Sequence, residues 1–252
     1  MKHLGGGIRG EILKMRHTFL FPFHGAVPVL GAVMFLLYYS VSGWSEPAQI
    51  SGYIEICGIA LPFAVSIVCA GNIRLEEQNH FQIFLGSYVQ RWKALAVKCL
   101  VLSGTGFLTI LAAVVLFGAG YSFLPGKEGI SMGVYVCLAV VLFLGSIPLY
   151  LEHLFLNLVF SGAVSQCIGA AQFLLSALFL TGLGDGKWQF FPCAWSARGA
   201  MLLLGGIGQG QSGGAYLWEL KKASVICLLL LAGICVIIGI WFHYYEGRHC
   251  ND

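Results

Sequence analysis

RLEEQNHFQIFLGSYVQRWKALAVK, residues 74–98, is the longest polar interval in a chain that is otherwise largely apolar. It holds six charged side chains, and apolar residues recur in it at intervals of three and four along residues 75–88. This spacing predicts a short amphipathic helix rather than a strand. Because long apolar runs flank it on both sides, we expect the helix to lie between two membrane-spanning segments.

The composition excludes a soluble protein. The 252 residues are 58% hydrophobic and 10% charged, with a mean hydropathy of +0.83, whereas soluble domains carry about 25% charged residues. Most of the nine cysteines fall in or beside apolar runs without metal-ligand spacing, so we expect buried free thiols and no metal site. The chain is predicted to be an all-α integral membrane protein.

Six apolar runs are long enough to span a bilayer, which takes about 20 residues. We expect a single membrane domain over residues 1–252, with an outer segment at 184–222 whose aromatic residues predict an interfacial belt or a short helix at the outer interface. Within that segment, the Gly-rich residues 205–214 predict a flexible loop. The predicted spans are 18–41, 50–71, 95–118, 131–148, 160–183 and 223–244.

The distribution of Lys and Arg predicts the orientation. With the N-terminus inside the cell, nine basic residues lie inside and five outside, so the positive-inside rule favours cytoplasmic N- and C-termini. The polar interval then faces the cytoplasm, either as a docking surface for a soluble partner or as a helix in the lipid headgroups. The candidate docking residues are Glu76, Glu77, Phe81, Gln82, Phe84, Leu85 and Arg91.

A second, smaller cytoplasmic contact is expected at 149–159, where Glu152, His153 and Asn157 supply polar groups within about one helical turn. Polar and aromatic residues elsewhere could line a substrate path, since intramembrane polar groups are often functional. For the glutamines the alternative is hydrogen bonding between helices. The candidates are Glu55, Gln166, Gln172, Trp188 and Trp195.

Patterns that suggest enzymes are incomplete. The GxGxxG match at 208–213 follows no predicted strand, and the phosphate-loop-like run at 182–188 is one residue short. We therefore expect no nucleotide site and no enzymatic activity in this chain. Glu76-Glu77 with His153 and Asn157 is similar to the intramembrane CAAX-type glutamate proteases, but Phe81 stands where that family has arginine.

The run Leu75–Lys98 resembles the coupling-helix region of type-2 ABC exporter permeases, with its Glu-Glu, Phe-Gln and Arg-x-Lys elements. The following pieces resemble, in order and spacing, the lantibiotic-immunity permeases of the MutG type. One departure is Cys193-Ala194, where an aromatic residue is expected after the proline. These pieces are Ile147-Pro148-Leu149, the small-residue fifth span, and Leu183-Gly184-Asp185 with Trp188, Pro192, Trp195 and Arg198.

The resemblance implies a permease subunit in the bacterial cytoplasmic membrane that expels a lantibiotic and gives the producer immunity. It implies two partners: a second, related permease and a cytoplasmic ABC ATPase dimer that binds ATP and Mg²⁺ and docks on the helix at 75–88. No nucleic-acid partner is expected. Another amphipathic cargo, such as a lipid, polysaccharide or drug, is the alternative.

Overall fold

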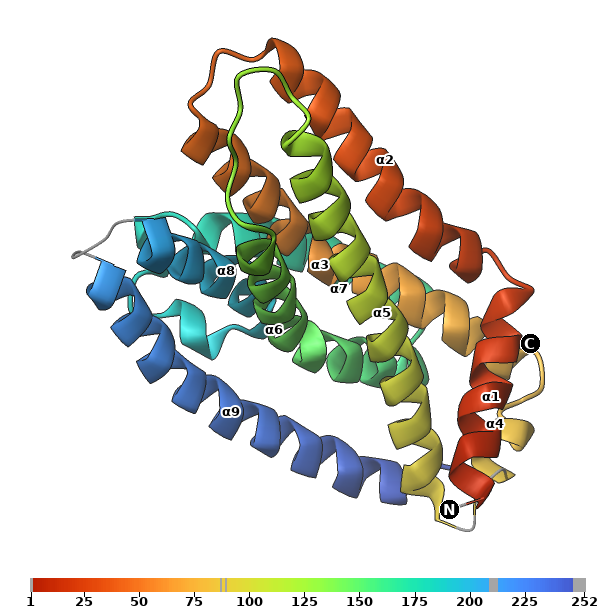
Figure 1. The fold of residues 1–252 in the computed structure, drawn as a ribbon. Helices are drawn as coiled ribbons and strands as arrows, with labels where there is room; N and C mark the ends of the chain where they lie inside the picture. The colour runs from red at the N-terminus through yellow and green to blue at the C-terminus, as the bar shows by residue number, and fades with distance from the viewer. Residues whose placement is uncertain (1, 87, 89, 209–212, 247–252) are drawn as a thin grey trace.

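The computed structural model of the chain describes residues 2–86, 88, 90–208 and 213–246. The described residues form helices and no strand (Figure 1). The α-helices are α1 (Lys2–Arg16), α2 (Leu20–Val41), α3 (Glu46–Glu77), α4 (Gln82–Gly86), α5 (Arg91–Tyr121), α6 (Met132–Val159), α7 (Gly162–Phe179), α8 (Pro192–Gly208) and α9 (Gly213–His243), and η1 (Gly182–Gly184) and η2 (Trp188–Phe190) are 3₁₀ turns.

Six of the described helices are long and apolar enough to cross a membrane: α2, α3, α5, α6, α7 and α9. The predicted all-α architecture with six candidate spans is therefore confirmed. The helices are mostly longer than the apolar runs, because polar residues continue several of them. Thus α6 runs through Pro148 to Val159, so residues 149–159 belong to the span and are not a separate loop.

The short helices α1 and α4 lie at one end of the bundle, here called the α1 end (Figure 1). The C-terminal end of α3, the start of α5 and the end of α9 meet there as well. The α2–α3 and α5–α6 connections and the start of α9 lie toward the opposite end. The arrangement keeps the beginning and the end of the described chain on the same side.

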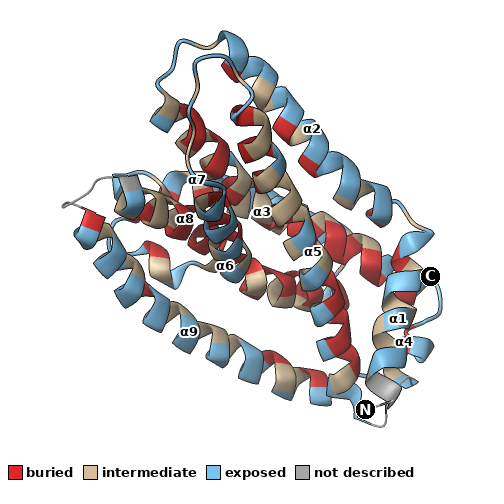
Figure 2. Cartoon of the chain, in the orientation of Figure 1, coloured by how far each residue is buried: buried red, intermediate tan, exposed pale blue. Residues whose placement is uncertain are grey.

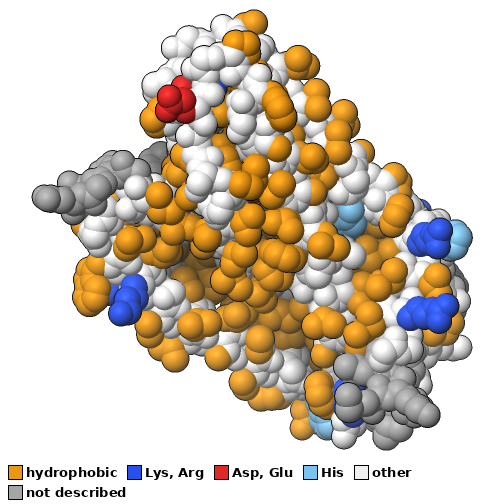
Figure 3. Space-filling model, viewed as in Figure 1, with side chains coloured by type: hydrophobic (Ala, Val, Ile, Leu, Met, Phe, Trp, Pro, Cys, Tyr) orange, Lys and Arg blue, Asp and Glu red, His pale blue; other side chains and the backbone are white. Residues whose placement is uncertain are grey.

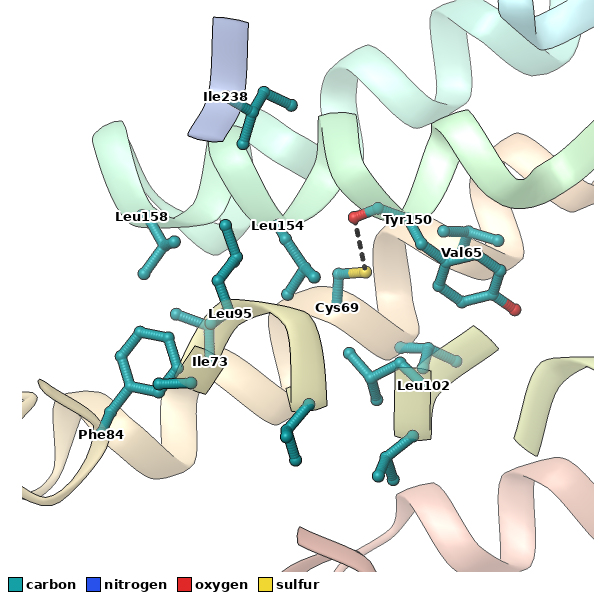
Figure 4. Packing of buried hydrophobic residues seen from close by; sticks show 14 of the residues in the cluster. Val65, Cys69, Ile73, Phe84, Leu95, Leu102, Tyr150, Leu154, Leu158 and Ile238 are labelled. Carbon is teal, nitrogen blue, oxygen red and sulfur yellow. Dashed lines mark hydrogen bonds between the residues drawn. The ribbon is translucent and has the colours of Figure 1, made fainter. Parts of the chain in front are cut away.

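Buried residues concentrate in α3, α5, α6 and α8, whereas most of α2 and α9 is exposed (Figure 2). The exposed side chains of α2 and α9 are largely aliphatic, as expected for helices that face lipid tails. At the centre, Cys69 of α3 places its thiol 3.9 Å from the carbonyl oxygen of Tyr150 in α6 (Figure 4). Side chains from α3, α5, α6 and α9 pack around this contact.

The largest departure from prediction is α8, which occupies part of the expected outer segment at 184–222. A Cβ on Gly58 of α3 would lie 2.5 Å from the Cα of Ala197, and one on Gly145 of α6 would lie 2.5 Å from the backbone nitrogen of Ser196. Both glycines thus let α8 pack directly on the middle of two spans. The Ser196 hydroxyl also donates to the Leu142 carbonyl at 2.9 Å.

The described ends of the Gly-rich segment, residues 205–208 and 213–214, are helical, in contrast to the prediction. Residues 205–208 complete α8, and α9 begins at Gly213 instead of near 223. The prediction of a loop is therefore wrong at both ends of the segment. The glycines there allow the two helix backbones to approach closely, since a Cβ on Gly213 would lie 2.1 Å from the Gly206 carbonyl oxygen. The rest of that prediction, at 209–212, lies outside the described residues.

Candidate functional site

The polar interval folds into a tight turn followed by one short helix. α3 ends at Glu77, His80 and Phe81 take positive φ angles of 48° and 59°, and α4 covers only Gln82–Gly86. A single helix over 75–88 is therefore wrong among the described residues. The turn is closed by the backbone N–H of Phe81, which donates to the Glu76 carbonyl at 3.0 Å.

Two aromatic docking candidates point into the protein. Phe81 and Phe84 are 0% and 3% exposed, and they make edge-to-face contacts with Tyr245 and Phe242 at the end of α9. Burial of both rings fixes the turn and α4 against the bundle. These two residues are therefore packing residues in this chain and do not offer their rings to a partner.

Glu76 is also buried, with a side chain that is 1% exposed, and it belongs to a cluster of four charged side chains. Its Oε1 accepts from Lys98 Nζ at 2.8 Å and from Lys14 Nζ at 2.7 Å. Lys98, fully buried on α5, also donates to Glu11 of α1 and to Asn72 of α3, each at 2.7 Å. The expectation that Glu76 faces a docking partner does not agree with this geometry.

The cluster joins α1, α3 and α5 through groups of opposite charge. Lys14 and Lys98 balance Glu11 and Glu76, so the site holds two cations and two anions in contact. Burial raises the pKa of Glu11, but the Lys98 and Lys14 ammonium groups outweigh it and lower that pKa below its ordinary value. Burial lowers the pKa of Lys14, and hydrogen bonds to Glu11 and Glu76 reverse that effect and raise it. Both groups stay charged near neutral pH.

Sequence reasoning found one member of this cluster as a site residue and missed the others. Asn72 and Glu76 are four residues apart in α3, and Glu11 and Lys14 three apart in α1, spacings that put each pair on one helix face. That periodicity was the available signal. The pairing across helices could not be read from it, because it depends on where α1 packs.

The remaining docking candidates lie at or near the surface of the same end. Gln82 and Arg91 are exposed, and Glu77 and Leu85 are partly exposed. Arg91 donates from Nη1 to the Tyr245 carbonyl at 2.9 Å, so it also ties the start of α5 to the end of α9. With Gln78, Asn79 and His80, which are exposed in the turn, these residues form what we call the turn surface.

The second predicted contact proves to be a network between α6 and α7. His153 donates from Nε2 to Gln172 Oε1 at 3.1 Å, and its Nδ1 is 3.0 Å from the Ser165 hydroxyl. The Gln172 amide donates to Glu152 at 2.7 Å, and the Asn157 amide donates to Ser165 at 2.9 Å. These bonds join α6 to α7. Because His153 and Asn157 are 0% and 1% exposed, they are not available to a cytoplasmic partner.

The predicted substrate-path residues do not converge. Glu55 is partly buried on α3, and Gln166 is exposed on α7. Trp188 and Trp195 are buried: the first donates to Glu219 at 3.2 Å and the second to the Gln189 carbonyl at 2.9 Å. The two tryptophans therefore do not form the expected surface belt.

Both tryptophans line an apolar groove of about 480 Å³ between α6, α8 and α9. The surrounding face is largely hydrophobic (Figure 3). A second apolar cavity, of about 190 Å³, lies between α2, α3 and α5. Its polar groups include His24, whose Nδ1 is 2.8 Å from the Thr109 hydroxyl. The described residues contain no group of three His, Cys, Asp or Glu side chains that could hold a metal ion.

No protein-family model matches the chain, and no curated protein matches it.

Proposed function

We propose that this chain is the permease subunit of an ATP-driven exporter that removes a lantibiotic-like antimicrobial peptide from the membrane. Such export would make a producing cell immune to its own peptide. The proposal includes cytoplasmic N- and C-termini and a location in a bacterial cytoplasmic membrane. It also includes two partners: a second, related permease and an ATPase that binds ATP and Mg²⁺.

The observation that carries the proposal is the packing of the turn surface, which is linked by contacts to the ends of α1, α3, α5 and α9. The turn and α4 are packed on the end of α9 through Phe81 and Phe84. Immediately behind them, the cluster of Glu11, Glu76 and Lys98 joins α1, α3 and α5. Because closely packed interiors transmit displacement, a partner that moves the turn surface would move four helices at once.

The apolar grooves support an amphipathic cargo. The groove between α6, α8 and α9 has almost entirely apolar walls, with Lys221 as its charged residue. An amphipathic molecule taken from the bilayer would keep its apolar side in such an environment. The same observation favours the second candidate, in which the permease carries a different amphipathic cargo such as a lipid, a polysaccharide or a drug.

The glutamate-protease alternative has less support. The Glu76 carboxylate is bound to two lysines, and no hydrogen bond among the described residues joins it to His153 or Asn157. A general base must reach the proton that it removes, and Glu76 is fully engaged elsewhere. We therefore propose a transport subunit and not an enzyme.

The test is purification of the tagged chain from its native membrane in mild detergent, with identification of the bound proteins. We expect a Walker-type ATPase and a second six-span protein. Asn79→Arg with Gln82→Arg, which adds charge and bulk to the exposed turn surface, should lower ATPase recovery at least tenfold, because unmatched charge at an interface disfavours association. Both positions are exposed, so thermal stability should stay unchanged.

The matched control is Phe123→Arg with Pro125→Arg, which adds the same two charges at exposed positions in the connection after α5, far from the turn surface. It should leave ATPase recovery unchanged. Recovery of the chain alone, under conditions that keep other ABC complexes together, would overturn the proposal. Equal loss in both variants would overturn the assignment of the turn surface as the docking site.

A further inference from the structure

Helix α1 has two faces of different chemistry. The inner face carries Glu11 and Met15, which pack on the bundle, and Glu11 is bound to Lys98. The outer face carries the exposed Arg9 and Arg16, with Ile12 and Leu13 49% and 46% exposed beside them. Glu11 is the only acidic residue of α1, so no carboxylate offsets the two arginines on the outer face.

The two guanidinium groups have no protein partner in the part of the chain that the structure describes. No hydrogen bond or ion pair joins Arg9 or Arg16 to another described residue. They are seven residues apart, which places them about two turns and ~10 Å from each other along one side of the helix. The outer face therefore presents two separate cations with aliphatic side chains between them.

The position of α1 relates this face to the bilayer. Only residues 17–19 separate α1 from the candidate span α2, and α1 changes direction there instead of continuing it (Figure 1). Phe19 and Phe21 at this junction are 54% and 64% exposed. Basic side chains lie along the α1 edge of the molecule, next to a hydrophobic surface (Figure 3). A helix with these properties at the start of a span lies in the headgroup region.

The charge cluster explains how so short a helix is held there. An isolated helix of about 15 residues is marginal in water, and α1 contains four glycines, which weaken it further. Lys98 and Glu76 bind its inner face through Glu11 and Lys14. The outer face is thereby fixed in direction before any ligand arrives, which reduces the entropy lost on binding.

We propose that the outer face of α1, formed by Arg9, Ile12, Leu13 and Arg16, binds the headgroups of anionic phospholipids in the adjoining leaflet. Guanidinium groups match phosphate oxygens in charge and geometry. The aliphatic side chains between them enter the boundary between headgroups and acyl chains. A soluble acidic protein would match the arginines but not the exposed Phe19 and Phe21, which continue into the lipid-facing side of α2. The inference depends on the membrane location and not on the proposed transport function.

The experiment uses the purified full chain in neutral detergent micelles, titrated with fluorescent phosphatidylglycerol and, separately, phosphatidylcholine. We expect preferential binding of phosphatidylglycerol that weakens as salt is raised. Each basic residue near an anionic membrane contributes about fivefold in affinity. Arg9→Gln with Arg16→Gln should therefore weaken phosphatidylglycerol binding by about 25-fold and leave phosphatidylcholine binding unchanged.

Two further variants make the result specific. Lys187→Gln with Lys222→Gln removes the same charge from exposed positions away from the α1 end, and it should change phosphatidylglycerol binding less than twofold. Arg9→Lys with Arg16→Lys keeps the charge and should keep most of the preference. Wild-type affinity for phosphatidylglycerol in the Arg9→Gln, Arg16→Gln variant overturns the proposal, and so does an equal loss in the Lys187→Gln, Lys222→Gln control. If the Arg9→Gln, Arg16→Gln variant loses ATPase recovery and keeps lipid binding, the face binds a protein instead.

Discussion

At the scale of single residues, Lys98 is central to the α1 end of the bundle. Its ammonium group is fully buried and donates to Glu11, Asn72 and Glu76. Together with Lys14 it neutralises two carboxylates. Removing Lys98 would leave two anions with one cation in a buried site, and an uncompensated buried charge is costly.

We therefore predict that Lys98→Met destabilises the protein by about 3–5 kcal/mol. The measurement is the thermal unfolding temperature in detergent. Adding Glu76→Gln should restore part of the loss, because Glu11 and Lys14 then remain as a balanced pair. Lys222→Met, an exposed change on α9, is the control and should alter stability by no more than about 0.5 kcal/mol. A double variant that loses the sum of the two single losses would show that Glu76 and Lys98 are not coupled.

The same residues show what the sequence could reveal about the site. The polar interval stands out from composition alone, and Glu76 lies in it as a predicted docking residue. Its role was predicted wrongly, because a carboxylate in a polar interval reads as exposed until its lysine partners are placed. Its two lysine partners, on α5 and α1, are 22 and 62 positions away in the sequence, and no local pattern reports such pairing.

At the scale of elements, α8 depends on small residues in its neighbours. Gly145 of α6 faces the α8 backbone at Ser196, so that an added Cβ would lie 2.5 Å from a backbone nitrogen. Backbone cannot move aside as a flexible side chain can, so the two helices must separate. The sequence of α8 alone could not predict this packing, since its 17 residues are too short to be recognised as a span.

We predict that Gly145→Ala destabilises the protein by about 1–3 kcal/mol, the usual range for overpacking. Gly104→Ala is the matched control: Gly104 lies inside α5 with nothing within 4 Å of an added Cβ. Since alanine favours helix by up to about 1 kcal/mol over glycine, the control should be neutral or slightly stabilising. Thermal unfolding in detergent measures both, and a stable Gly145→Ala variant would contradict close packing of α8 on α6.

At the scale of the whole molecule, hydropathy predicted the six candidate spans, because membrane-spanning helices must satisfy their backbone groups internally over a fixed apolar length. The ends of the helices were predicted less well, since polar residues at Glu77 and Asn157 continue α3 and α6. Contacts between distant segments, such as α1 with α5, lie beyond any periodicity argument.

Orientation remains a prediction that follows from the same whole-molecule view. Arg9, Arg16, Arg74 and Arg91 belong to the α1 end, and fewer basic side chains lie toward the opposite end, so the positive-inside rule places the α1 end in the cytoplasm.

Labelling with a membrane-impermeant maleimide in intact cells tests this orientation. Glu128→Cys, exposed between α5 and α6, should react at once, whereas Gln82→Cys, exposed on α4, should react only after the membrane is opened. The wild-type chain measures the background from its own cysteines. The reverse pattern would invert the topology, and it would place the turn surface on the side of the membrane that has no ATP, which excludes ATPase docking there.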